Sequence, residues 1–591
     1  MKLWQIWLVF AVTLVSHQCL GEHTHETVNL EKQKTIVKSM NLDSEPCSDF
    51  LRYSCGNWWR DHNRNQNYYN DHLEYLEYNV TMELIGHLEK PNVMENKPKF
   101  AKTVQTLYNS CMNSRTFVAH YYMIVLKQLE GIDWMLLAKN ETGQVDYDWL
   151  QIFAVASRYG MKDILLDEYI APMEGEPTQM AIHLRKYANR YGFNRMSDQD
   201  FRNLRDTMDT EVNVNGYYKD IENFESKLKD IEKLKYPTRS KKIWQVQDIP
   251  YEWLKKYLKY LVEPVHSLDP QMRVVVSDLE YLKALDEFLM KSDPKFLRIY
   301  MELRFLSYFD NNVLELRKRP CLKAVQWIMP LAMHWIYEDM HPLNVGAHNE
   351  IQHMFSRILQ EINNTAYQDR YGAIDPESLH KLITMQLVIG NLPRSNTIEF
   401  LEQHYASITL TSQFYKNFLA IQQQNAKRML EALFNPTPAA NEFYDKFENL
   451  PYVAVNKPRY YPAHNVMLLP SYLPRTSEYH PEFEDIFKYS FLGSTLASAV
   501  YSTLTFRTFD YDQLQMVKTV GGIQASYDVF FAHNSHEHLE VKGDAKDLSL
   551  RQLFLINVMQ KNCGTVVNEY ALNAIVTYLR DFGEVFDCNV D

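Results

Sequence analysis

The sequence predicts a large, mainly α-helical protein with a smaller α/β part, and three observations lead to this prediction. The chain has 591 residues, 46% of them hydrophobic, which is enough for more than one domain core. Glycine is scarce, since 18 residues make up roughly 3% of the chain where about 7% is usual. Apolar residues recur at three- and four-residue steps over most of residues 65–440, whereas the last 140 residues include short strand-like segments.

The helical periodicity is clearest in six segments, and proline-marked breaks near Pro237, Pro393 and Pro436 predict loops between helix bundles. Two short runs rich in β-branched and aromatic residues, Tyr452–Val455 and Val466–Leu469, predict strands. The six helical segments are Tyr68–Leu88, Phe100–Leu126, Leu279–Phe288, Phe296–Leu306, His348–Ile362 and Phe414–Leu433.

The charge balance excludes one class of partner. Charged residues make up 23% of the chain, and the formal net charge is −12. Nucleic-acid binding needs clustered positive charge to neutralise phosphates, so we expect no nucleic-acid partner. An acidic balance is compatible with an extracellular protein but selects no particular ligand.

The N-terminus predicts export. Lys2 is followed by an apolar run from Leu3 to Val15, which is shorter than the roughly 20 residues of a transmembrane helix. Small residues follow the run, so residues 1–21 are predicted to be a secretory signal peptide, with an uncleaved anchor as the alternative. We expect a secreted, extracellular protein with no membrane span after cleavage. Residues 22–45 are expected to be a polar, mobile segment.

The cysteines agree with an oxidising compartment. The chain has seven, and removal of the signal peptide with Cys19 leaves an even number. Six cysteines allow fifteen connectivities, so the spacing alone selects none. The six are Cys47, Cys55, Cys111, Cys321, Cys563 and Cys588, and sequons for glycosylation of a secreted chain occur at Asn79, Asn140 and Asn363.

The segment Pro46–Trp59, PCSDFLRYSCGNWW, resembles an N-terminal motif of the neprilysin and endothelin-converting-enzyme family of zinc metalloendopeptidases. It has the Pro-Cys, Asp-Phe and Cys-Gly-x-Trp of that motif at the same spacing. The resemblance extends over roughly residues 46 to 588. Further matching landmarks are Leu107–Cys111, Cys321–Tyr337, Gln552–Leu555, Cys563-Gly564, Leu572–Val576 and Phe582–Cys588.

The resemblance implies a two-lobed, neprilysin-like architecture, in which a large helical domain caps a thermolysin-like C-terminal lobe. We therefore expect a mostly helical N-terminal domain over residues 46–440 and a peptidase-like domain over residues 441–591. The resemblance also implies three disulfides, Cys47–Cys588, Cys55–Cys563 and Cys111–Cys321. In the chain-entropy model, each of the two longest would contribute on the order of 4–5 kcal/mol to stability.

The segment Ile486–Gly522, expected to form a short helix, a loop and a Gly-Gly turn, stands where the family has its zinc site. Catalytic zinc needs three protein ligands and an open position for water, and His-Glu-x-x-His supplies two ligands and a general base. The five matching positions here run from Ser494 through Thr495 to Ser498, so hydroxyls replace both imidazoles and the base. Anchoring on Gly521-Gly522 places Gln515 at the third ligand and Thr519 at the position that orients a histidine.

Substrate-binding positions differ as well. The family's edge strand corresponds to residues 455–461, where Asn456, Tyr460 and Tyr461 are kept but Pro458 removes a backbone donor. Ala571 stands where the family has a substrate-binding arginine. We therefore predict a catalytically inactive family member that holds no cofactor, although the family uses zinc. Its predicted partners are extracellular peptides or a secreted protein, and its oligomeric state is left open.

Two other functions remain open. The chain would be an active zinc metalloendopeptidase in peptide processing if His533, His536 or His538 supplied relocated ligands, although a solvated loop explains these residues more simply. A structural or storage role is the third possibility. A further hypothesis gives Lys457 or Arg459 the positive charge of the missing metal, against the alternative of two surface cations on a loop.

Overall fold

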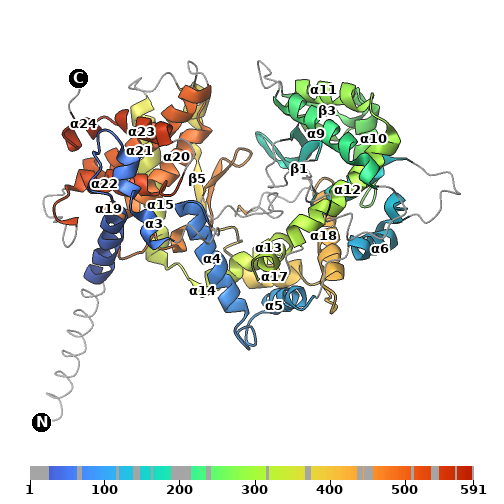
Figure 1. Ribbon diagram of the computed structural model, residues 1–591, viewed down its shortest axis with the longest axis horizontal. Coiled ribbons are helices and arrows are strands. Elements are labelled where there is room, and N and C mark those ends of the chain that lie inside the picture. Colours follow the sequence, from blue (N-terminus) through green and yellow to red (C-terminus); the bar gives the residue numbers. More distant parts are fainter. Residues whose placement is uncertain are drawn as a thin grey trace, which may run out of the picture. The chain divides into compact units, whose positions relative to one another are not determined.

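The structure is a computed structural model, and the part of the chain that it describes is mainly helical, with small β-sheets (Figure 1). The predicted fold class is thereby confirmed. The described residues are 25–62, 69–114, 119–137, 147–161, 164–187, 202, 214–233, 241–313, 318–366, 374–435, 443–444, 457–506, 511–533, 545–565 and 569–588. None of the helices among them is long and apolar enough to cross a bilayer.

The chain forms two compact units, each assembled from separate segments. Unit 1 combines residues 1–83, 337–391 and 454–591, and unit 2 combines residues 84–336 and 392–453. The units therefore alternate along the sequence. The expected domain boundary between residues 440 and 441 lies outside the described residues and stays a prediction.

Unit 2 is a helical unit with a four-stranded sheet in the order β1-β2-β4-β3. Its helices form where apolar residues share one face, as in α10 (Glu252–Val262), which buries Leu254, Tyr257 and Leu261. Its other elements are α5 (Lys99–Met112), α6 (Ala119–Glu130), η2 (Met135–Leu137), α7 (Trp149–Arg158), β1 (Leu166–Met173), β2 (Glu176–Lys186), η3 (Val214–Tyr217), α9 (Tyr218–Lys233), β3 (Lys242–Gln245), η4 (Val246–Asp248), β4 (Arg273–Val276), α11 (Leu279–Leu289), α12 (Pro294–Val313), α13 (Lys318–Ile328), α17 (Thr397–His404) and α18 (Phe414–Glu431).

Unit 1 contains a three-stranded sheet in the order β5-β7-β6, with β7 parallel to β5 and antiparallel to β6. The chain enters unit 2 along α4 (His72–Leu88) and returns along α14 (Pro330–Met340). The other elements of unit 1 are α2 (Phe50–Cys55), α3 (Trp58–Asp61), α15 (Val345–Ala366), α16 (Pro376–Thr384), β5 (Gln386–Ile389), β6 (Arg459–Tyr461), β7 (Val466–Leu469), η5 (Leu473–Arg475), α19 (Asp485–Lys488), η6 (Tyr489–Gly493), α20 (Ser494–Thr503), α21 (Tyr511–His533), α22 (Leu550–Gln560), α23 (Glu569–Thr577) and α24 (Phe582–Val585).

Most predicted elements are found within a few residues of their expected positions. The strand Val466–Leu469 is β7, whereas Tyr452–Val455 lies outside the described residues. The segment Phe100–Leu126 is two helices instead of one, because α5 ends at Met112. Asn and Ser follow there, and their side chains compete with helical backbone hydrogen bonds.

The two ends of the chain are joined in unit 1. The three disulfides Cys47–Cys588, Cys55–Cys563 and Cys111–Cys321 are present as predicted. Gly564 has φ +85°, and a Cβ atom there would lie 2.7 Å from the ring of Trp58, so only glycine fits at this contact. The side chain of Asn573 donates to Asp49 at 2.9 Å and accepts from the backbone N–H of Leu51 at 2.8 Å.

Residues 25–39, expected to be part of a mobile segment, form a helix. The side chain of Ile36 is 1% exposed, because this helix packs an apolar face on unit 1. Lys32 forms a buried ion pair with Glu478, and His72 approaches the other carboxylate oxygen of Glu478 at 3.3 Å. Burial alone would raise the pKa of Glu478, but the contacts with Lys32 and His72 hold it well below its usual range.

We expect the double variant Cys55→Ser/Cys563→Ser to unfold at a lower temperature than the wild type. Loss of a native disulfide costs about 2–5 kcal/mol, because the unfolded chain gains freedom. Calorimetry measures the change in unfolding temperature. The variant Cys111→Ser/Cys321→Ser removes the disulfide of unit 2 and is the matched control for loss of a disulfide outside unit 1. Non-reducing peptide mapping should return the three pairs, and a Cys47–Cys55 cross-link in the folded protein would contradict this fold.

Candidate site at helices α20 and α21

The degenerate zinc motif lies on a continuous helical stretch. α19 runs directly into the π-helical turn η6, which runs into α20 at Ser494. Leu496 and Val500 are both fully buried and Leu504 is 3% exposed, so one face of this helix lies in the core. Ser494 is also fully buried, whereas Ser498 is half-buried.

The Gly-Gly pair is not a turn, which corrects the expectation from the sequence. Gly521 and Gly522 lie in the middle of α21, where α20 packs directly against it (Figure 1). A Cβ atom on Gly522 would lie 2.5 Å from the Cα atom of Ser498, and one on Gly521 would lie 2.5 Å from the ring of Tyr501. Gly522 is needed because the backbones of the two helices touch there, and Gly521 because the Tyr501 ring packs on it.

The contacts between α20 and α21 separate the expected ligand positions. Ser498 meets Gly522, and the carbonyl oxygen of Ser502 accepts from Lys518, so the two helices run antiparallel. Gln515 precedes Lys518 on α21 and therefore lies beyond Ser502 instead of beside Ser494. Because each helical residue advances by about 1.5 Å, this places Gln515 on the order of 16 Å from Ser494 along the axis of α20. The side chain of Gln515 is exposed.

The hydroxyls at the motif positions are hydrogen-bonded within their own helices. Ser494 Oγ donates to the carbonyl oxygen of Ser490 at 2.5 Å. Thr495 Oγ1 donates to that of Phe491 at 2.7 Å, and Thr519 Oγ1 to that of Gln515 at 3.0 Å. Each of these hydroxyls donates to a carbonyl oxygen one helical turn earlier, which is a common structural use of serine and threonine.

The residue that contacts the first motif position is Lys561, which the sequence analysis did not identify. Its Nζ donates to Ser494 Oγ at 2.5 Å and lies 6.0 Å from the centroid of the Phe491 ring. One turn earlier on the same face of α22, Asn557 Nδ2 donates to Ser490 Oγ at 2.7 Å. Asn557–Ser490 and Lys561–Ser494 thus form two polar rungs between neighbouring helical segments.

Burial lowers the pKa of Lys561 to about 7, because its surroundings disfavour the charged ammonium. Part of the side chain remains accessible, but the ammonium is surrounded by protein at Ser494, and these surroundings govern the pKa. Within the described residues, no carboxylate forms an ion pair with Lys561. A lysine two residues after the largely apolar run 553–559 was the available sequence signal.

The residues at the motif do not fit a zinc ion. Serine hydroxyls are neutral and protonated near pH 7, whereas zinc prefers thiolate, imidazole and carboxylate ligands. Ser494 uses its proton on Ser490 and accepts from the Lys561 nitrogen, whose charged form would repel a metal ion. Within the described residues, no group of three or more His, Cys, Asp or Glu side chains is arranged to hold a metal.

The remaining predicted site residues fall into three groups. Tyr460 and Tyr461 lie in β6, where the Tyr460 hydroxyl donates to Asn465 at 2.9 Å. Asn79 is in α4, Asn363 in α15 and Ala571 in α23. Outside the described residues, or with undescribed side chains, lie Asn140, Asn456, His533, His536 and His538.

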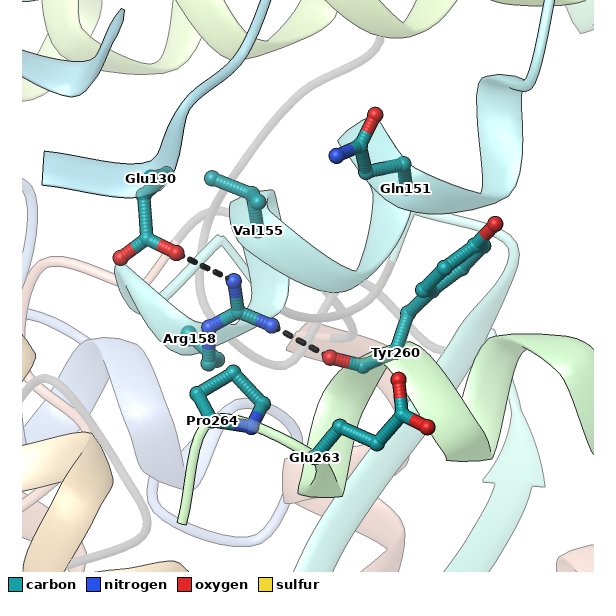
Figure 2. A pocket seen from close by; sticks show the side chains of 7 residues that line it. All are labelled: Glu130, Gln151, Val155, Arg158, Tyr260, Glu263 and Pro264. Carbon is teal, nitrogen blue, oxygen red and sulfur yellow. Dashed lines mark hydrogen bonds and ion pairs between the residues drawn. The ribbon is translucent and has the colours of Figure 1, made fainter. Parts of the chain in front are cut away.

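A cavity of about 260 Å³ (Figure 2) lies in unit 2, whereas the motif helices belong to unit 1. Arg158 forms an ion pair with Glu130 at its edge and donates to the carbonyl oxygen of Tyr260 at 2.6 Å. Glu130 also accepts from the hydroxyl of Tyr159. Arg158 and Glu130 are thus paired with each other, and the other charged residue of the lining, Glu263, lies 3.5 Å from Lys259.

Fold and motif together define a metallopeptidase-like protein whose motif helices carry hydroxyls where zinc ligands would be. The chain belongs to peptidase family M13, since the sequence profile described as "Peptidase family M13" matches residues 46–365. Mouse neprilysin is 21% identical over 93% of this chain and 86% of its own length, and neprilysin of Pongo abelii is 20% identical over the same shares.

Solved structures are similar over nearly the whole chain. The inhibitor complex of Mycobacterium tuberculosis zinc metalloprotease Zmp1 has a TM-score of 0.66 at 12% identity, covering 93% of this chain and 96% of that one. The Haemonchus galactose-containing glycoprotein complex has a TM-score of 0.68 at 11% identity, covering 94% and 96%. At these identities the likeness shows the fold alone.

We expect Gly522→Ala to destabilise the protein by about 1–3 kcal/mol, because its Cβ atom would collide with the Ser498 backbone. Gly86→Ala is the matched control, since no atom lies within 4 Å of a Cβ there. Alanine in a helix should stabilise that position by roughly 0.5–1 kcal/mol. Denaturant unfolding measures both, and equal effects of the two substitutions would contradict the close helix contact.

Proposed function

We propose that this M13-family protein lacks zinc-dependent peptidase activity and acts outside the cell by binding peptides or a secreted protein. One observation supports the first part above all. The hydroxyl at the first ligand position, Ser494, lies between a helix carbonyl and the nitrogen of Lys561. A cation that polarises a peptide carbonyl would have to displace both contacts.

The position of the general base supports the same proposal. A metallopeptidase uses a carboxylate to take a proton from the attacking water. Thr495 stands there, and its hydroxyl donates to Phe491. A threonine hydroxyl does not accept protons from water near neutral pH, so a metal bound nearby would still lack its base.

The extracellular part of the proposal rests on the predicted signal peptide and on the cysteine pairing. Disulfides that join positions 541 and 508 residues apart persist only under oxidising conditions. Binding is proposed because the chain keeps the family fold and three disulfides, while the residues at the motif positions differ from zinc ligands. Glycans at Asn79 and Asn363 would accompany secretion.

We expect the purified, secreted protein to contain far less than one zinc per chain. It should also show no chelator-sensitive cleavage of a mixed library of quenched fluorescent peptides. Elemental analysis and fluorescence measure the two quantities, with an active M13 peptidase prepared in parallel as the positive control. Stoichiometric zinc together with phenanthroline-sensitive cleavage would contradict the proposed lack of zinc-dependent peptidase activity.

That outcome would favour the active enzyme with relocated ligands, and the triple variant His533→Ala/His536→Ala/His538→Ala would then lose its zinc. The binding part has its own test. The immobilised protein should retain a subset of extracellular peptides or proteins that a heat-unfolded sample does not retain. Equal retention by both samples would contradict a specific binding function and favour a structural or storage role.

A further inference from the structure

Lys561 places an ammonium group among protein atoms, with no carboxylate partner found in the described residues. Burying an ammonium without a carboxylate partner costs free energy, and a hydrophobic residue of similar length would avoid this cost. The neighbouring positions 553–556, 558 and 559 on α22 are apolar and buried. Groups that are kept at a cost to stability are candidates for a functional role.

The contacts of Lys561 define a joint between two helical segments. Lys561 follows the last residue of α22, and Ser494 is the first residue of α20. Asn557 bonds to Ser490 one turn earlier, so the two rungs fix how α22 lies against η6 and α20. Of these two rungs, only the one formed by Lys561 contains a group that titrates.

We propose that Lys561 and Ser494 form a proton-operated latch, which holds the start of α20 against α22 when the amine is neutral and loosens it when the amine is charged. The neutral amine still donates to Ser494 Oγ, so the rung persists without a buried charge. The charged form keeps the hydrogen bond but carries the desolvation cost, which local opening of the joint relieves. The latch does not depend on the proposed absence of peptidase activity.

Within the described part of the chain, other titratable groups near this joint come from η6, α4 and α20. From η6, the Tyr489 hydroxyl accepts from Arg357 at 3.1 Å. From α4, the ring centroid of His72 lies 6.5 Å from that of Phe491, and His72 faces the buried pair of Lys32 and Glu478. α20 contributes Tyr501, which is 2% exposed. Burial is the cause of the low pKa of Lys561, so these neighbours are not part of the latch. A substitution at one of them can therefore serve as a control.

The sign of the pH dependence follows from linkage. The folded pKa of about 7 lies below the ordinary lysine value of about 10.4, so the opened state binds more protons. Stability of the joint therefore rises with pH from about 7 towards 10 and is lowest below about 7. Between pH 6 and pH 8 the opening equilibrium should change about tenfold.

Hydrogen exchange followed by mass spectrometry tests the latch in the full-length protein. After correction for the intrinsic pH effect, amides of residues 489–503 should exchange about tenfold faster at pH 6 than at pH 8. Lys561→Met should remove this difference, and His72→Gln should keep it. No pH difference in the wild type, or the same difference in Lys561→Met, would overturn the proposal. Addition of zinc or a chelator should change neither result.

A second measurement needs no variant and covers the case in which Lys561→Met fails to fold. Competitive acylation of the wild-type protein at a series of pH values reports the neutral fraction of each lysine. Lys561 should show a midpoint near pH 7, whereas the exposed Lys283, whose pKa Glu280 raises, should show one above 10. A midpoint for Lys561 equal to that of Lys283 would overturn the latch.

Discussion

The joining of the two chain ends is the constraint on which unit 1 depends. Phe50 packs edge-on against both Phe582 and Phe586, with 5.0 Å between ring centroids in each pair. The disulfides join the same segments covalently. This attachment fixes α22 through Cys563, only two residues after Lys561. The position of the lysine beside Ser494 is thus a consequence of how the termini meet, as well as of its own hydrogen bond.

The motif helices show why a catalytic site can change while its scaffold remains. α20 and α21 are held by backbone contact at Gly522 and by the buried side chains of Leu496 and Val500. None of these interactions requires a metal ion. Ser494 at the first ligand position and Thr495 at the position of the base both donate to backbone carbonyl oxygens, so neither hydroxyl is left unsatisfied.

Much of the fold could be predicted from the sequence, because helix periodicity and cysteine landmarks are local patterns. The strand Val466–Leu469 and all three disulfides were found as expected. The Gly-Gly pair was misjudged as a turn, since a glycine needed for close helix packing has the same sequence signal as one needed for a turn. The role of Lys561 was missed because its partner Ser494 is 67 residues away, and such tertiary contacts leave no periodic pattern.

The closure of the ends also sets an order of events during biosynthesis. Cys47 and Cys55 are synthesised long before their partners, which follow 541 and 508 residues later. At roughly 5–20 residues per second, the wait is on the order of 25 to 100 s. During this time unit 1 lacks its C-terminal helices, and the apolar face that includes Phe50 has no partner. Protection of the nascent chain from premature cysteine pairing, by a chaperone or a disulfide isomerase, is therefore a requirement of this topology.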